Sequence, residues 1–357
     1  MLYNPYTRGG ATIAIGAAGG AVFLILNLAL PWVLGSLTAT FLVRKVTGFR
    51  TDLPRSWRGY AMVAIGTMLG TSFTSDVVAH AGGWAVSIVA MLLLSLGFGL
   101  FAYMVFRLFG GMDRATALFA ATPGGLTVVS LLAEQYDAAV NRVALCHTAR
   151  LVVLLASAPF IIETISGIDL SDANSAFLNP IEPLDPLRHG GLVLVAVVSW
   201  AVARRSSLPS ALLLFPLLSS AVLHGSGLMT VHVPPVLSSL AQVVIGAGVG
   251  ARFADYTLRQ ILRDGWLAAL VGLALALGAL AAAWAMVHVT GDEIAPLFLA
   301  YLPGGAPELG VVALALMINP AMVAAHHVSR VFLIVAILPV LARRLAVPME
   351  DTDSVSK

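Results

Sequence analysis

The sequence predicts an all-α integral membrane protein made of two copies of one hydrophobic unit. Of its 357 residues, 59% are hydrophobic and only 11% are charged, and the mean hydropathy is +0.92. Soluble domains carry about 25% charged residues, so a chain this poor in charge needs lipid as the solvent for most of its length. The chain also matches itself at an offset of 180 residues, which indicates a duplication.

Apolar stretches that suit a membrane span recur along the chain, since a transmembrane helix needs about 20 mostly apolar residues. In the first half they run over 11–30, 31–43, 60–78, 84–109, 115–133 and 140–162. In the second half they run over 190–203, 208–223, 236–253, 265–289, 294–317 and 320–341. The one long polar segment predicts a division into repeat 1 (1–163), a periplasmic linker (164–188), repeat 2 (189–345) and a cytoplasmic tail (346–357).

Matches between motif residues at the 180-residue offset indicate the duplication more strongly than matches between apolar residues do. Pro123-Gly124-Gly125 falls on Pro303-Gly304-Gly305, and His147 and Arg150 fall on His327 and Arg330. A register shared by these residue types does not arise from apolar composition alone.

The basic residues indicate that the two copies insert in opposite orientations, because cytoplasmic loops carry an excess of Lys and Arg. After the second stretch, copy one has a basic loop and copy two does not; after the third stretch, the difference is reversed. The residues concerned are Arg44, Lys45, Arg50, Arg55 and Arg58 in copy one, and Arg252, Arg259 and Arg263 in copy two. We therefore expect a multi-pass protein of a bacterial inner membrane with both termini in the cytoplasm.

Inverted copies must each cross the membrane an odd number of times, yet each has six apolar stretches. The Pro-Gly-Gly stretch is the one that we expect not to cross the membrane, because proline removes an amide donor and glycine weakens a helix. Broken backbone at membrane depth survives only beside protein or a water-filled cavity. We predict about five crossings plus one re-entrant or broken helix per copy; the alternative is that the short stretch 31–43 dips instead.

The two broken segments are the first candidate site. Paired, interrupted segments in inverted halves are typical of a transporter's central binding site, and helix N-termini favour anions. The alternative is that the glycines only allow close helix packing. The candidate binding residues here are Pro123, Gly124, Gly125, Pro303, Gly304 and Gly305.

Ionisable residues at membrane depth form the second candidate set: His147, Arg150, His327, Arg330 and Glu308. Charges in apolar spans are expensive, so they face a cavity or one another. Each His–Arg pair could hold an anion through the arginine, with the histidine carrying a proton. The alternative is a structural ion pair between an arginine and a glutamate of the neighbouring hairpin. Glu308 is the best single site for a proton or a cation.

These motifs resemble the AbrB family of bacterial membrane proteins over nearly the whole chain. The shared features are a duplicated hydrophobic unit, Pro-Gly-Gly in each copy and a later His/Arg helix. Glu308 occupies the family's glutamate position, whereas the first copy has Val128 there. Members are labelled ammonia monooxygenases or regulators of gene expression, and the name is shared with an unrelated soluble DNA-binding regulator.

We expect a secondary transporter of a small organic ion, with proton coupling left open and any effect on gene expression indirect. The alternatives implied by the resemblance are a membrane-bound monooxygenase and a non-transporting regulator. A copper or iron oxygenase needs several converging ligands, and His147, His326 and His327 are too few, so an enzyme is the less favoured reading.

No zinc-type cluster, phosphate-binding glycine loop or nucleophile elbow is present in the sequence, so we expect no metal and no cofactor. The expected partners are the lipid bilayer and a small-molecule or ion substrate. The net charge of +2 argues against nucleic acid, and a homo-oligomer stays open.

Overall fold

The computed structural model describes residues 4–124, 126–167, 185–231 and 233–345, and every regular element within them is helical. In the first half the helices are α1 (Pro5–Ile25), α2 (Ser36–Thr47), α3 (Arg55–Thr71), α4 (Ser75–His80), α5 (Ala85–Leu108), α6 (Arg114–Ala121), α7 (Leu126–Gln135) and α8 (Val140–Ser166). A π-helical turn, Pro31–Gly35, leads into α2, and a 3-10 turn, Ala81–Trp84, leads into α5.

In the second half the helices are α10 (Pro186–Ala203), α11 (Ala211–Gly225), α12 (Pro235–Ala254), α13 (Leu258–Gln260), α14 (Trp266–Thr290), α15 (Ile294–Tyr301), α16 (Ala306–Ala315) and α17 (Pro320–Leu345). A π-helical turn, Ile261–Gly265, joins α13 to α14. The bounds of α6 and α7 recur 180 residues later as those of α15 and α16.

Six helical spans among the described residues are long and apolar enough to cross a membrane. They are Pro5–Ile25, Ser75–Leu108, Val140–Ser166, Val236–Ala254, Leu258–Thr290 and Pro320–Leu345. The prediction of an all-helical chain with the composition of a membrane protein is therefore confirmed. Several of the other predicted stretches form shorter apolar helices, including His189–Ala203, Ala211–Gly225 and Ala306–Ala315.

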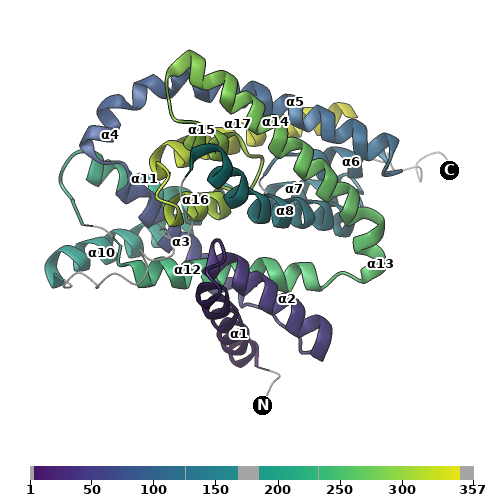
Figure 1. Cartoon of the computed structure of the whole chain (residues 1–357), viewed down its shortest axis with the longest axis horizontal. Helices are drawn as coiled ribbons and strands as arrows, with labels where there is room; N and C mark the ends of the chain where they lie inside the picture. The colour runs from purple at the N-terminus through teal and green to yellow at the C-terminus, as the bar shows by residue number, and fades with distance from the viewer. Residues whose placement is uncertain (1–3, 125, 168–184, 232, 346–357) are drawn as a thin grey trace, which may run out of the picture.

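The helices gather into two bundles, and each bundle takes helices from both halves of the chain. The first bundle consists of α1, α2, α3, α10, α11 and α12, and the second of α5–α8 and α14–α17. In Figure 1 the first bundle occupies the lower and left part of the view, and α5, α6, α7, α8 and α14 lie at the upper right. Helices α3 and α12 face the second bundle, contacting α16, α17 and α8.

Close glycine contacts fix the directions of the helices in the first bundle. A Cβ on Gly66 would meet the carbonyl oxygen of Leu213, and one on Gly70 would lie 2.6 Å from that of Leu217. The residue numbers of the contacting pairs therefore increase together along α3 and α11, which means that the two helices are parallel. The two glycines, Gly66 and Gly70, therefore serve the close packing of α3 against α11.

The corresponding glycines of the second half make the reciprocal contact. A Cβ on Gly246 would meet the carbonyl oxygen of Val33, and one on Gly250 would meet that of Leu37. Helix α12 therefore runs parallel to α2. Small residues allow this close approach of helix backbones in a membrane bundle.

The Pro-Gly segments interrupt the second bundle at two places. Helix α6 ends at Ala121 and α15 at Tyr301, because the next residue in each case leaves the helical region, with ψ of 126° and 129°. Gly124 then has φ +94°, a value that residues with a Cβ rarely adopt. The amide of Ala139, before α8, donates to the hydroxyl of Thr116 at 2.9 Å, so α8 begins beside the start of α6.

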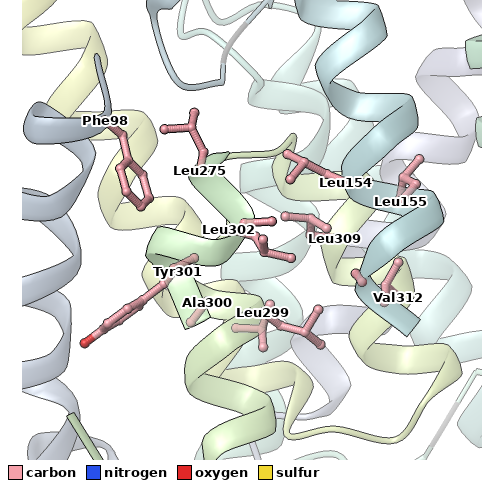
Figure 2. Close-up of a cluster of buried hydrophobic side chains, with 14 of the residues drawn as sticks. Phe98, Leu154, Leu155, Leu275, Leu299, Ala300, Tyr301, Leu302, Leu309 and Val312 are labelled. Atoms are coloured by element: carbon pink, nitrogen blue, oxygen red, sulfur yellow. The ribbon is translucent and has the colours of Figure 1, made fainter. Parts of the chain in front are cut away.

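The core of the second bundle surrounds the α15–α16 break. Figure 2 shows Leu302 and Leu309 on either side of the break, with Leu154 and Leu155 of α8 facing them and Phe98 and Leu275 nearby. The Tyr301 ring points away from this cluster, and its hydroxyl donates to the carbonyl of Ser87 on α5 at 3.1 Å. Apolar packing on this side of the break helps to hold the broken backbone in place.

Candidate functional site

The two Pro-Gly breaks meet each other inside the protein. A Cβ on Gly124 would lie 3.5 Å from the carbonyl oxygen of Gly304, the residue 180 positions later. Phe98 likewise contacts its counterpart position, because its ring lies 2.9 Å from a Cβ built on Gly278. In a two-fold arrangement, only residues near the axis contact their own counterparts. Both contacts therefore have the form expected near a pseudo-two-fold axis.

Arg330 binds the carbonyl groups at the α15 break. It is 2% exposed and donates to the oxygens of Leu302 at 2.6 Å and Gly304 at 2.9 Å. A helix C-terminus leaves carbonyls unpaired and carries a partial negative charge, and a nearby cation compensates for both. Arg330 therefore supplies the hydrogen bonds that the interrupted helix lacks.

Arg150 makes the corresponding contacts in the first half. It is 3% exposed and donates to the oxygens of Ala120 at 3.4 Å and Thr122 at 2.9 Å. It also lies close enough to Arg330 for their like charges to repel each other. The centre of the protein thus holds two cations, each directed at the end of a broken helix.

The paired histidines complete these contacts. His147 Nε2 donates to the carbonyl of Phe119 at 2.9 Å, and its Nδ1 lies 3.3 Å from an Arg150 nitrogen. His327 repeats the pattern with Leu299, at 3.1 Å, and with Arg330. A carbonyl only accepts and a guanidinium only donates, so each ring is neutral, with its hydrogen on Nε2.

This geometry changes two expectations for the His–Arg pairs. No ion pair joins Arg150 or Arg330 to a glutamate within the described residues, since both arginines bind backbone carbonyls instead. A proton-carrying histidine is also disfavoured, because a second proton on His147 would direct an N–H at Arg150. The pairs are better explained as caps of the broken helices. Elsewhere, His224 near the end of α11 is also buried, with its Nε2 2.9 Å from the carbonyl oxygen of Val231.

A cavity of about 660 Å³ separates the two bundles beside the breaks. One wall comes from α3, α12 and the connection between α10 and α11. The other comes from the two breaks, α8 and the start of α16. Pockets that hold small molecules span about 300–1,000 Å³, so this volume suits a metabolite.

The charge of the cavity wall is strongly positive. Five arginines line it, and Glu308 is its only acidic lining residue among those described; the arginines are Arg55, Arg58, Arg150, Arg204 and Arg252. A concave site with one sign of charge concentrates ligands of the opposite sign. The cavity is therefore built to attract an anion.

Glu308 lies in the first turn of α16, 8% exposed, where the positive end of the helix faces it. Its carboxylate folds back over Gly305, so that a Cβ at that glycine would collide with it. It accepts a hydrogen bond from its own backbone amide and is attracted by Arg252. The carboxyl group of Glu308 therefore already occupies the beginning of α16.

The structure brings most of the predicted site residues to this cavity. Gly124, His147, Arg150, Pro303, Gly304, Gly305 and Glu308 line it. His327 and Arg330 are buried behind it, and Pro123 packs toward Gly99, whose added Cβ would lie 3.8 Å away. Gly125 lies outside the described residues.

Sequence reasoning missed four of the cavity's arginines: Arg55, Arg58, Arg204 and Arg252. They served only as indicators of orientation, because a basic residue near a helix end satisfies the positive-inside rule wherever its side chain points. Their shared location at helix ends was the available signal.

A family model described as "Transition state regulatory protein AbrB" matches residues 32–346. The chain belongs to the AbrB family. The Escherichia coli (strain K12) protein "Putative regulator AbrB" is 26% identical over 324 residues, covering 90% of this chain and 91% of its own. The Bacillus subtilis (strain 168) protein "Uncharacterized protein YhjN" is 24% identical over 356 residues, covering 93% and 92%. The residues that match the AbrB family model thus include helices of both bundles and the lining of the cavity between them.

Proposed function

We propose that this AbrB protein is a secondary transporter of a small organic anion in a bacterial inner membrane. The observation that carries the proposal is the cavity between the bundles, where two broken helices meet under five arginines and one glutamate. Transporters with inverted repeats bind substrate at such breaks, because the backbone groups freed there can contact it. The proposal makes the cavity the substrate site.

Inverted repeats are supported by the helix directions. Ala61 of α3 packs against Val244 of α12, and Arg58 of α3 lies near Gly248 of α12. A lower residue number in α3 thus meets a higher one in α12, so the two helices are antiparallel. Since α12 runs with α2, and α3 runs with α11, α2 and α11 point in opposite directions. These two helices are counterparts at the 180-residue offset, as inversion requires.

Orientation follows from the positive-inside rule. The cavity arginines Arg55, Arg58, Arg204 and Arg252 belong to helix ends that we assign to the cytoplasm, together with both termini. The cavity would then be open toward the cytoplasm, and each α6–α7-type hairpin would be re-entrant. Movement of the second bundle against the first would expose the breaks to the other side.

The name of the E. coli relative describes a regulator. A transporter can change gene expression indirectly by altering the concentration of a metabolite that other proteins sense. The proposal therefore accommodates such a name without contact between this chain and DNA.

Uptake of labelled small anions into proteoliposomes tests the proposal. We expect the purified protein to take up at least one anion of a broad panel of mono-, di- and tricarboxylates and phosphate esters, under imposed proton and potential gradients. Glu308→Gln should change the rate, whereas Glu134→Gln, on the exposed surface of α7, should not. Uptake of no anion under any gradient would contradict the proposal.

A further inference from the structure

We infer that the substrate is a dianion, a dicarboxylate or a phosphate monoester, and that Arg58, Arg55 and Arg252 bind it. This inference rests on the proposed transport function and adds the chemical class of the substrate. Its starting point is that the arginines of the cavity differ in how fully the protein already satisfies them.

Arg150 is committed to the protein itself. Its guanidinium bonds Ala120, Thr122 and the ring of His147, and it is 3% exposed. Arg204 stacks on the ring of Trp200, with its guanidinium carbon 4.6 Å from the ring centre. Arg150 therefore has little capacity left for a ligand, whereas Arg204 is held at the exposed rim of the cavity by its stacking on Trp200.

Arg58 has unused capacity. Its Nε is buried and has no hydrogen-bond partner within the described part of the chain. A buried donor without a partner destabilises the fold, so such groups are rare in the absence of a ligand or water. Its one ion pair, with Asp52, is long at 3.7 Å, and the aspartate is 53% exposed.

Two further arginines lie near Arg58 and add positive charge around it. Arg252 and Arg55 both repel Arg58, and Asp52 and Asp255 attract it from the protein surface. Arg252 uses its Nε for the carbonyl of Gly248, at 3.2 Å, so its terminal nitrogens are available. Asp255 is itself bound to Arg44.

The number of arginines on the cavity wall favours a ligand with more than one negative charge. Arg55 and Arg58 both line the cavity, and Arg252 lies on the same wall. Two guanidinium groups that repel each other are stabilised most by an anion that bonds both. Carboxylate and phosphate oxygens match the forked donors of arginine. A ligand with two negative charges fits this site.

Thermal unfolding of the detergent-purified full chain at matched ionic strength tests the inference. The probes are succinate against its monoamide, and glycerol 3-phosphate against glycerol. We expect at least one dianion to raise the Tm saturably and its singly charged or neutral partner to have little effect. Arg58→Gln should weaken the apparent affinity about tenfold or more, because hydrogen bonds between charged groups are strong. Arg58→Lys should retain part of the affinity.

Arg343→Gln, exposed at the end of α17, is the matched control and should bind as the wild type does. If Arg58→Gln unfolds without ligand, Arg252→Gln is measured in its place and should show the same loss. Equal shifts by both partners of each probe pair, no shift by either dianion, or unchanged binding by the variant would overturn the inference. Transport of monoanions alone would contradict the dianion and leave transport standing. Dianion binding without any flux would support the dianion site and contradict transport.

Discussion

At the level of single residues, Arg330 illustrates how a charge is accommodated inside this bundle. Its nearest partners are two backbone carbonyls and a histidine ring, which carry no net charge. They nevertheless present three acceptors, and the end of α15 adds the negative end of its dipole. The broken helix and the buried arginine therefore stabilise each other.

Arg330→Met should destabilise the protein strongly. The substitution leaves the carbonyls of Leu302 and Gly304 buried without their donor, and each lost hydrogen bond to a charged group contributes about 1.5–3 kcal/mol. Arg343→Met removes the same group from an exposed position and should change stability little. Thermal unfolding in detergent measures both variants, and equal Tm values for the two would contradict the capping role.

The sequence identified these residues but not their partners. Offset matching found His147, Arg150 and their counterparts, because chemically distinctive residues stand out in apolar spans. Their partners are backbone oxygens, which every residue carries, so no residue type marks them. The structural alternative drawn from the sequence was therefore an ion pair with a glutamate, and neither Arg150 nor Arg330 makes one within the described residues.

At the level of the helices, packing depends on glycines that let two backbones approach. In α3, the Gly70 position lies against the carbonyl of Leu217 and the side chain of Ser220. In α5, Gly97 has no heavy atom within 4 Å of an added Cβ. Two glycines in similar apolar helices therefore have opposite surroundings.

Gly70→Ala should lower the stability, and Gly97→Ala should preserve or raise it. The first substitution inserts a methyl group against backbone atoms that cannot move aside, and such overpacking costs about 1–3 kcal/mol. The second adds a better helix former in open space, worth up to about 1 kcal/mol. Unfolding midpoints of the purified variants would show the difference, and a larger loss for Gly97→Ala would contradict the packing.

For the whole molecule, ion pairs join the two halves of the chain. Arg142 of α8 donates to Asp264 at 2.6 and 3.1 Å, and the side chain of Asp264 is 6% exposed. Arg44 pairs with Asp255 across the other bundle, where the aspartate is 55% exposed. One contact is largely shielded from water and the other is not.

Asp264→Asn should therefore destabilise the fold by about 3–5 kcal/mol, because it leaves a largely buried guanidinium without its counter-charge. Asp255→Asn should cost about 0.2–1 kcal/mol, as exposed pairs generally do. Chemical or thermal unfolding of both variants tests this order. Equal losses would mean that the Arg142 pair does not hold the halves together.

The sequence alone predicted the all-helical class with membrane-like composition and the positions of both breaks, whereas most of the predicted linker, 168–184, lies outside the described residues. Proline, glycine and charge are rare enough in apolar spans for their pattern to be read directly. It did not predict the exchange of helices between bundles, because Gly66 and Gly246 indicate close packing but not the partner helix. The cavity arginines were missed for a similar reason, since Arg58 is ordinary in a basic loop.

In the function proposed above, this AbrB protein is a carrier that alternately exposes one anion site to the two sides of the membrane. Counterflow in proteoliposomes tests it most directly, with the vesicles preloaded with an unlabelled anion and labelled anion added outside. We expect preloading to accelerate labelled uptake, and we expect Arg58→Gln to reduce this acceleration while Arg343→Gln does not. Uptake that is absent for every anion tested, or that is unaffected by preloading, would contradict it.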